Sequence, residues 1–407
     1  MTNLGSLSAD VLLAPGPNDS VSELRWSPIS NHLTISGWDN ILRVYEITQS
    51  SGSPHSGNLL FTHALSAPLL SCDWSKDGTR VATGSTDRKA FLLDLNAHGS
   101  LPIQVAAHAA PIKSVRFVTV PGSNGPILAT GSWDETIKFW DMRQSTPLAS
   151  LNCEGRVFSM DSAGMLLAAG TSEGKVHVVD LNNPTVCRTT TKTALHKQIR
   201  VVSCFPTGDG YAVGGIEGRC AFVYLDPEKA SENFSFKCHR FDTPVSASTS
   251  QRSLLSSHPQ TSSTDVYAVN AISFHPLHRT FSTAGSDGSF AFWDQAAHLR
   301  LRHFPHVAAA RTSSGMAGAA TDRQTTSFGS GGSRQKRGNV STGVPGQAAI
   351  TATGFNGDGG LFAYAVGYDW SRGYRGSLVG REDRVLVHVV GDECVPKSNS
   401  KAGRNLK

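Results

Sequence analysis

The chain has 407 residues, of which 39% are hydrophobic and 17% charged, so it can bury a large core, and wholesale disorder is excluded. The formal net charge of +5 is by itself too small to indicate a nucleic-acid-binding protein. The seven cysteines are scattered and never form a C-x-x-C pair, which argues against a zinc ribbon and a secreted disulfide scaffold and indicates a reducing compartment.

Residues 1–17 are expected to be an N-terminal extension. They contain no basic stretch and no long apolar run, so we expect no signal peptide, and no later segment approaches 18 uncharged apolar residues, so we expect no membrane span. The short run Val11–Leu13 could form an outer strand that closes a ring of repeats, because an unclosed ring would leave sheet edges exposed.

A short signature recurs along the rest of the chain. Small residues are followed by a variable residue and an acid, and the first five acids are 39 to 48 residues apart. In five copies a large apolar residue and a second acid lie six and seven positions after the first acid. The six copies of the signature itself are Ser36-Gly37-Trp38-Asp39, Gly84-Ser85-Thr86-Asp87, Gly131-Ser132-Trp133-Asp134, Gly170-Thr171-Ser172-Glu173, Gly215-Ile216-Glu217 and Gly285-Ser286-Asp287.

The segments that flank the signature are predicted strands. Strings such as VATGST, KAFLLDL and IKFWDM alternate with period two, are rich in β-branched and aromatic residues, and end at Gly, Asp or Asn. Units of about four short strands cannot bury a face alone and must stack radially, so the sequence predicts an all-β fold with seven blades. The predicted blades are 18–48, 60–96, 104–143, 152–182, 196–227, 234–296 and 347–391.

Two low-complexity inserts interrupt this period. Ser and Thr supply 12 of the 22 residues in 243–264, and residues 306–347 are rich in Gly, Ser, Ala and Arg. We therefore expect a propeller over 18–391 with two flexible loop inserts, followed by a basic tail over 392–407.

Several strings resemble the WD-repeat β-propeller pattern and, within it, one subfamily. GSWDETIKFWDMR, GGIEGR, FKCHR, YAVNAISFHP and YDWSRG are similar to the Gle/Rae-type mRNA-export factors of nuclear pores and to their relative, the Bub-type mitotic-checkpoint propeller. The final YDWSRG and the opening PNDSVS favour the export factors.

The resemblance also implies a partner-binding site. In this family one face of the propeller receives a GLEBS segment from a nucleoporin or a checkpoint kinase, and acidic side chains of that segment pair with arginines in the channel mouth. The matching positions are Arg200 and Arg240, with Trp38 and Tyr267 beside them. From the residues alone, an ordinary surface ion pair is the favoured interpretation of each arginine.

Three tryptophans strengthen the binding interpretation. Trp38, Trp133 and Trp370 fall in or beside the turns between the second and third strands of their units, where Thr or Ser suffices in other copies. Such aromatic side chains indicate a contact surface, although packing against a neighbouring loop would explain them as well.

A catalytic site is not indicated. His108, Ser132 and Asp134 could suggest a catalytic triad, but together with Trp140 they match the structural hydrogen-bond network of a WD blade, and Ser132 does not lie in a G-x-S-x-G motif. No metal-binding histidine motif and no phosphate-binding loop is present. We therefore expect no enzyme, no metal, no cofactor and no small-molecule substrate.

The positive charge is concentrated outside the blades. Residues 300–337 contain seven Lys or Arg and one acid, and residues 394–407 contain four and none. Such segments suit contact with RNA phosphates or nuclear import, but they could also be merely solvated.

The function expected from the sequence is that of a non-enzymatic scaffold. It would bind a GLEBS-containing nucleoporin at the nuclear pore, promote mRNA export, and possess basic loops for contact with mRNA or mRNP, with a nuclear and also cytoplasmic location. The alternative is a mitotic spindle-checkpoint adaptor that binds checkpoint kinases through the same pocket.

Overall fold

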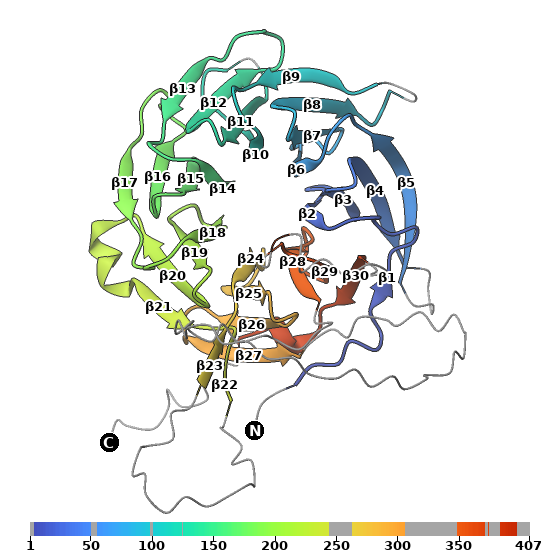
Figure 1. Ribbon diagram of the computed structural model, residues 1–407, viewed down its shortest axis with the longest axis vertical. Helices are drawn as coiled ribbons and strands as arrows, with labels where there is room; N and C mark the ends of the chain where they lie inside the picture. The colour runs from blue at the N-terminus through green and yellow to red at the C-terminus, as the bar shows by residue number, and fades with distance from the viewer. Residues whose placement is uncertain are drawn as a thin grey trace, which may run out of the picture.

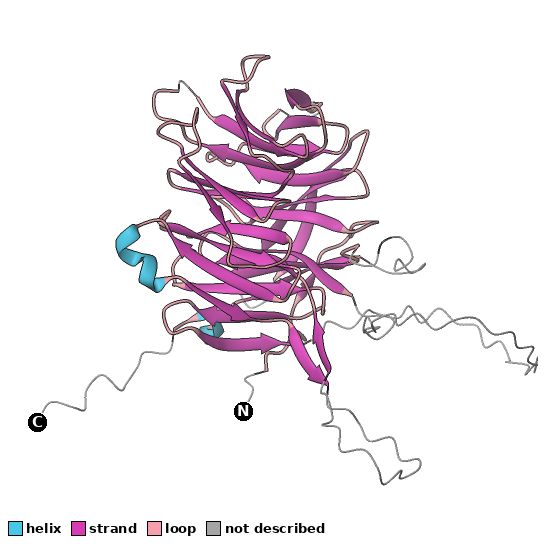
Figure 2. Ribbon diagram, turned by 60° about the vertical axis from the view of Figure 1, so that its left-hand side comes forward, coloured by secondary structure: helices cyan, strands magenta, loops and turns pink. Residues whose placement is uncertain are grey.

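The computed structural model describes residues 4–49, 55–97, 101–123, 125–243, 263–305, 348–370, 373 and 383–396. Seven four-stranded antiparallel sheets stand radially around a central channel (Figure 1). Figure 2 shows that the regular structure in these ranges is nearly all strand, apart from the 3₁₀ helices η1 (Pro227–Glu232) and η3 (Asp392–Cys394). The prediction of an all-β, seven-bladed propeller is confirmed.

The strands of each blade are ordered from the channel to the rim. Blade 1 is β2 (Val21–Trp26), β3 (His32–Gly37), β4 (Ile41–Thr48) and β5 (Ser56–Ala64); blade 2 is β6 (Leu69–Trp74), β7 (Arg80–Ser85), β8 (Lys89–Asp94) and β9 (Ile103–Ala107). Blade 3 is β10 (Ile112–Val118), β11 (Ile127–Ser132), β12 (Thr136–Asp141) and β13 (Ala149–Asn152); blade 4 is β14 (Val157–Ala163), β15 (Leu166–Thr171), β16 (Lys175–Asp180) and β17 (Thr189–Lys192). Blade 5 is β18 (Ile199–Cys204), β19 (Gly210–Gly215), β20 (Arg219–Tyr224) and β21 (Phe234–Lys237); blade 6 is β24 (Val269–Phe274), β25 (Thr280–Gly285), β26 (Phe290–Asp294) and β27 (Leu299–Phe304). Blade 7 is β28 (Ala349–Phe355), β29 (Leu361–Gly367), β30 (Arg384–Val389) and β1 (Val11–Leu12).

The two ends of the chain build blade 7 together. Val11 of β1 pairs with Val387 of β30 in antiparallel register. Just before β1, the Asp10 carboxylate lies 2.6 Å from His388 Nδ1 and accepts a hydrogen bond of 2.7 Å from the Tyr364 hydroxyl. The N-terminal strand therefore covers the edge that β30 would otherwise expose.

In blades 2 and 3 the sheet begins one strand later than the predicted unit. The unit 60–96 starts inside β5, which belongs to blade 1, while the outer strand of blade 2, β9, begins only at Ile103. A repeat in the sequence gives the period but does not show to which neighbouring sheet the outer strand belongs, so this offset could not be found from spacing alone.

The recurring acids form the turns between second and third strands. Asp39 Oδ1 accepts a hydrogen bond from the backbone N–H of Ile41 (3.2 Å), and Asp134 Oδ1 accepts one from that of Thr136 (3.1 Å). The residue after each acid has a positive φ, for example 64° at Asn40 and 70° at Gly174. The carboxylate of the acid therefore accepts a hydrogen bond from a backbone N–H in a tight turn, where a backbone carbonyl oxygen would otherwise be needed.

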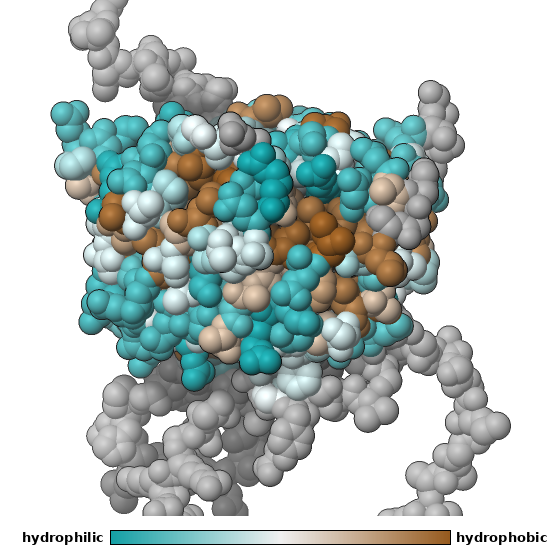
Figure 3. Space-filling view, turned by 90° about the horizontal axis from the view of Figure 1, so that it is seen from above, coloured by the Kyte–Doolittle hydropathy of each residue, from teal (hydrophilic) through white to brown (hydrophobic). Residues whose placement is uncertain are grey.

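The core lies between neighbouring blades. Leu24 of blade 1, for example, packs in one buried cluster with Ala363 and Val387 of blade 7 and with Leu13. Each sheet thus buries its faces only because a neighbour covers them, as expected for a radial repeat. On the rim the surface is mixed (Figure 3), with exposed hydrophobic side chains on outer strands, such as Leu60 and Ile103.

The first insert begins and ends in regular structure. β22 (Arg240–Thr243) pairs with β23 (Ser263–Val266), and this hairpin projects beyond the ring (Figure 1). Residues 244–262, the second insert 306–347 and the tail residues 397–407 lie outside the described residues. In the part of the chain that the structure describes, no helix is long and apolar enough to cross a membrane.

Candidate functional site

A hollow of about 310 Å³ opens at one end of the channel, and we call it the mouth. It is lined by residues from the inner strands and from the turns between second and third strands: Ser20, Val21, Ser22, Trp38, Leu70, Lys113, Trp133, Phe158, Gln198, Ile199, Arg200, Asn270, Thr351, Tyr368, Asp369 and Trp370. The structure therefore brings four of the six predicted partner-binding residues together, namely Trp38, Trp133, Arg200 and Trp370. Arg240 and Tyr267 do not line the mouth.

The aromatic side chains of the mouth are held by the turns that carry them. The ring centroids of Trp38 and Trp370 are 5.9 Å apart, and those of Trp370 and Tyr368 are 5.5 Å apart. Trp370 is 41% exposed and has a φ of 58°, a left-handed conformation that is costly for a bulky residue. The fold thus holds a large apolar side chain open to solvent.

Trp133 contributes a polar group as well. Its backbone N–H donates to the carbonyl oxygen of Pro111 (3.0 Å), which fixes the turn. Its indole Nε1–H is buried and has no acceptor among the described residues. A buried donor without an acceptor costs about 1–3 kcal/mol, so a bound partner that offers an acceptor to this N–H would remove that cost.

Arg200 is exposed, and neutral acceptors orient it. Its Nε donates to Asn270 Oδ1 (3.2 Å) and its Nη2 donates to the carbonyl oxygen of Asp369 (2.9 Å). Asn270 is fixed in turn, because its Nδ2 donates to the carbonyl oxygen of Ile350 (3.0 Å). These two contacts therefore fix the position of the guanidinium. Because both acceptors are neutral oxygens, they do not neutralise its charge.

Lys113 is a second cation in the mouth, and the sequence interpretation missed it. Its ammonium lies 3.4 Å from the carbonyl oxygen of Leu70. Burial lowers the pKa of Lys113, and repulsion from Arg200 and Arg116 lowers it further, while Glu23 opposes this effect. The only sequence signal was its place one residue after the buried Ile112 on an inner strand, where alternation turns a side chain toward the channel.

Arg240 and Tyr267 lie at the base of the β22–β23 hairpin. Both Nε and Nη2 of Arg240 donate to the carbonyl oxygen of Glu217, at 3.1 and 2.5 Å. Tyr267 packs edge-on against Phe241, which is 46% exposed. The turn that contains Glu217 also leads toward the mouth, because the N–H of the preceding Ile216 donates to the carbonyl oxygen of the mouth residue Gln198.

The predicted structural network in blade 3 is present, with one difference. His108 Nδ1 lies 2.8 Å from Asp134 Oδ2, and Thr130 Oγ1 joins His108 Nε2 (2.7 Å) to Trp140 Nε1 (2.8 Å). Thr130 therefore occupies the linking position expected for Ser132. Both residues lie on β11 and on the same side of it, so the sequence pattern did not separate them.

Ser132 has a different task. Its hydroxyl lies 3.0 Å from the carbonyl oxygens of Ala110 and Pro111, and it accepts a hydrogen bond from the N–H of Asp134 (3.1 Å). A nucleophilic serine would need a hydrogen bond to the histidine, whereas His108 Nε2 contacts Thr130. Burial lowers the pKa of His108, although Asp134 opposes this, so the imidazole is a neutral part of the network.

Blade 6 repeats the network with His239. His239 Nδ1 lies 2.9 Å from Asp287 Oδ1, and Thr283 Oγ1 bridges His239 Nε2 (3.0 Å) and Trp293 Nε1 (2.9 Å). The sequence interpretation did not identify this copy, because the insert places 48 residues between the histidine and its acid, against 26 in blade 3.

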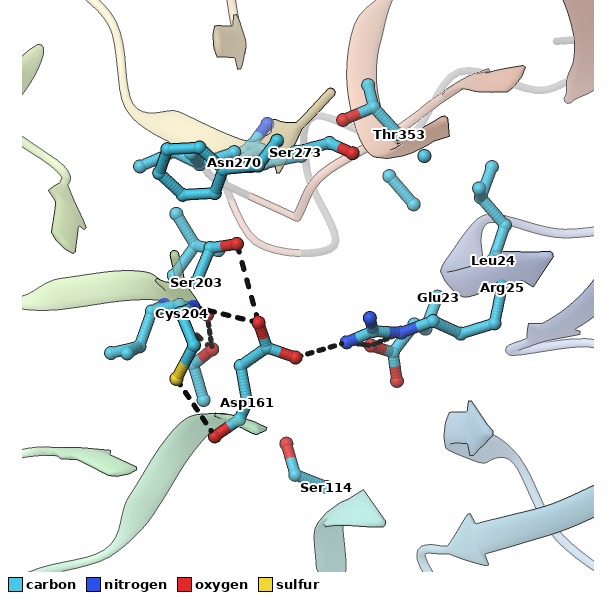
Figure 4. A pocket seen from close by; sticks show the side chains of 18 of the residues that line it. Glu23, Leu24, Arg25, Ser114, Asp161, Ser203, Cys204, Asn270, Ser273 and Thr353 are labelled. Carbon is cyan, nitrogen blue, oxygen red and sulfur yellow. Dashed lines mark hydrogen bonds and ion pairs between the residues drawn. The ribbon is translucent and has the colours of Figure 1, made fainter. Parts of the chain in front are cut away.

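The channel below the mouth is polar and its charges are paired. Arg25 Nη2 lies 3.0 Å from Asp161 Oδ1 (Figure 4), and Arg116 Nη2 lies 2.6 Å from Glu23 Oε1. Burial alone would raise the pKa of Glu23, but Arg116 and Arg25 lower it to about 2. These ion pairs join the inner strands β2, β10 and β14 of blades 1, 3 and 4 across the channel. Within the described ranges no group of three His, Cys, Asp or Glu side chains could hold a metal ion.

Comparison with known proteins agrees with this geometry. The family model described as WD domain, G-beta repeat, matches residues 11–46, 57–94, 100–141 and 249–294, which together with the fold defines a WD-repeat β-propeller protein. The chain is 44% identical to the WD40 repeat protein poxJ of Penicillium oxalicum, over 98% of this chain and 99% of that protein.

Two further relatives have names that describe a process. The mRNA export factor GLE2 of Chaetomium thermophilum is 40% identical, and the poly(A)+ RNA export protein of Schizosaccharomyces pombe is 39% identical; each match covers 98% of this chain and 96% of the relative. The chain belongs to the Gle/Rae-type family of WD-repeat mRNA-export factors.

Proposed function

We propose that this protein is a non-enzymatic scaffold of mRNA export that binds a GLEBS-type segment of a nucleoporin across the mouth. The observation that carries the proposal is the convergence of Trp38, Trp133 and Trp370 with the positioned cation Arg200 around one hollow. The names of full-length relatives support the process, mRNA export.

The aromatic part of the mouth supplies apolar contact area. Tryptophan is among the residues that contribute most binding energy at protein interfaces, above all where it is surrounded by contacts that exclude water. An apolar side chain of the segment would cover Trp38 and Trp370, and a carbonyl oxygen of its backbone would accept from the buried Nε1 of Trp133. Satisfying that donor removes a cost of about 1–3 kcal/mol that the free protein bears.

The cationic part of the mouth selects an acidic segment. Arg200 presents a guanidinium whose described acceptors, Asn270 Oδ1 and the Asp369 carbonyl oxygen, are neutral. A carboxylate bound there would gain charge-assisted hydrogen bonds in a partly desolvated site. The same carboxylate would also relieve the repulsion between Arg200 and Lys113, so that one acid of the segment would satisfy two cations.

The base of the hairpin offers a second contact for a longer segment. A chain that leaves the mouth over Gln198 reaches the turn at Glu217, and beyond it Arg240 and Tyr267. We include both residues in the proposed binding surface as an outer contact, with Phe241 as exposed apolar area beside them.

The location and the contact with RNA follow from the same proposal. A scaffold bound to a nucleoporin would reside at the nuclear pore and in the nucleus, with a cytoplasmic fraction. The basic segments 300–337 and 394–407 would contact mRNP phosphates, an interaction that weakens with salt and tolerates any RNA sequence.

The proposal is tested by competition between two classes of partner. Immobilised full-length protein is presented with equal concentrations of a GLEBS-type nucleoporin segment and a GLEBS-type segment of a checkpoint kinase. We expect the nucleoporin segment to be retained preferentially. Preferential retention of the kinase segment would support the checkpoint alternative, and retention of neither would contradict a GLEBS-binding function.

A further inference from the structure

Blade 5 contains a pair of cysteines that neither the mouth nor the hydrogen-bond networks require. Cys220 lies on β20, and Cys238 directly follows β21. Their sulfur atoms are 3.6 Å apart, within hydrogen-bond distance for thiols. Cys220 is fully buried and Cys238 is 6% exposed, and both are reduced.

The two thiols differ in their surroundings. The hydrogen bond from Cys220 lowers the pKa of Cys238 against the effect of burial, and the neighbouring charges of His239 and Arg240 lower it further. Burial raises the pKa of Cys220 well above its ordinary value. Cys238 is the less buried of the two and lies beside the cationic Arg240, which suits an attacking cysteine, and Cys220 lies within reach to resolve it.

The position of Cys238 couples the pair to the hairpin. Its N–H donates to the carbonyl oxygen of Gly218 (3.0 Å), so it sits at the last rung between β21 and β20. The next residue, His239, has a φ of 49° and is bound to Asp287 of blade 6. Arg240 then begins β22 and holds the Glu217 carbonyl oxygen. The chain thus passes directly from Cys238 to the base of the hairpin.

A disulfide between these residues requires movement. An S–S bond is about 2.05 Å long, so the sulfur atoms must approach each other by about 1.5 Å. In the β20–β21 ladder Cys220 pairs with Phe236, which makes Cys238 its diagonal neighbour. Diagonal α-carbons are typically about 7–8 Å apart, while a disulfide needs about 4.4–6.8 Å, so the end of β21 must shift toward β20.

We infer that Cys220 and Cys238 form a redox-sensitive dithiol, which a peroxide converts to an intrachain disulfide that displaces the base of the β22–β23 hairpin. In the first step the Cys238 thiolate attacks one peroxide oxygen, the O–O bond breaks, and a sulfenic acid and water form after protonation. In the second step the Cys220 sulfur attacks the sulfenic sulfur, the S–O bond breaks, and the S–S bond and a second water form. Two thiols are oxidised, and one hydrogen peroxide is reduced to two waters.

The first readout is the bond itself. The full chain is treated with hydrogen peroxide, free thiols are alkylated under denaturing conditions, and the digest is analysed by mass spectrometry. We expect a peptide pair linking Cys220 to Cys238 that is cleaved by dithiothreitol. The link should persist in Cys187→Ala, which removes the half-buried thiol of blade 4, and should be absent in Cys220→Ala. Absence of this link in the oxidised wild type, which needs no variant to be interpreted, would overturn the inference.

The second readout is the displacement of the hairpin. Backbone hydrogen exchange is compared between reduced and oxidised wild type for Arg240–Thr243 and Ser263–Val266. We expect roughly tenfold faster exchange in the oxidised protein, with β10–β12 of blade 3 unchanged and full recovery on reduction. A disulfide that forms without any change in exchange at the hairpin would contradict the proposed coupling.

Discussion

Replacement of Thr130 by valine tests whether the network in blade 3 holds the propeller together. The substitution preserves shape but removes the hydroxyl that joins His108 Nε2 to Trp140 Nε1. Thr130 is fully buried and Trp140 is 4% exposed, so water cannot replace the hydroxyl without local opening. Two buried ring nitrogens would lose their partner, at about 1–3 kcal/mol each, and we expect a loss of roughly 2–6 kcal/mol in the free energy of unfolding.

Urea denaturation followed by circular dichroism measures this loss. Thr130→Ser is the matched control, because it retains the hydroxyl and removes one methyl group, at a cost of about 1 kcal/mol. A repeat protein can unfold in more than one step, so the midpoints of all variants are compared under identical conditions. Equal midpoints for Thr130→Val and Thr130→Ser would refute the role of the hydroxyl, and a larger loss for Ser132→Ala than for Thr130→Val would return the linking role to Ser132.

Three other outcomes are expected. Burial alone would lower the pKa of His388, but Asp10 and Glu393 raise it to about 9. The stability that the protonated His388 contributes is complete below pH 6.5 and is lost as the pH rises through about 9, so the stability of wild type relative to His388→Gln should fall by about 3 kcal/mol over that window. A difference that stays constant with pH would contradict the assignment. Replacing residues 306–340 by a short Gly-Ser linker should leave the cooperative thermal transition within a few degrees, because such a composition cannot offset its ordering entropy; loss of the transition would show that the segment contributes to the fold. Trp133→Phe should weaken binding of a GLEBS-type segment by roughly three- to tenfold in a fluorescence titration without lowering thermal stability, since the lost ring area is offset by removal of a buried N–H that has no acceptor among the described residues. Unchanged affinity would exclude that N–H as a contact.

The fold was largely predictable because the turns impose a local chemical requirement. In four blades the turn between the second and third strands contains an aspartate that accepts from the backbone, namely Asp39, Asp87, Asp134 and Asp287. The outer strands impose no comparable requirement. For this reason the pattern located seven units but not the blade to which β5 belongs.

The site was predictable only in part, because it depends on contacts between distant segments. The turns placed Trp38, Trp133 and Trp370, and the family resemblance supplied Arg200. Nothing local in the sequence shows that Lys113, on a different blade from Arg200, enters the same mouth.

Arg240 makes a contact that the family resemblance did not describe. The family resemblance matched Arg240 to an arginine of the channel mouth. In the structure its guanidinium donates to the carbonyl oxygen of Glu217 at the base of the hairpin. That hairpin pairs Arg240 with Val266 across a long insert, and such pairing has no signal in a Ser- and Thr-rich sequence.

Titration of a GLEBS-type segment against three forms of the protein tests the central claim most directly. Wild type is compared by isothermal calorimetry with Arg200→Glu in the mouth and with Lys192→Glu, an exposed charge reversal on the outer strand β17 of blade 4. A carboxylate at position 200 would oppose the acidic segment in a site that the bound segment covers, whereas reversal at a rim position away from the segment costs about 0–1 kcal/mol. We predict at least a tenfold loss of affinity, about 1.4 kcal/mol, for Arg200→Glu alone. Equal small losses in both variants would show general electrostatic attraction, and full affinity in Arg200→Glu would contradict binding at the mouth.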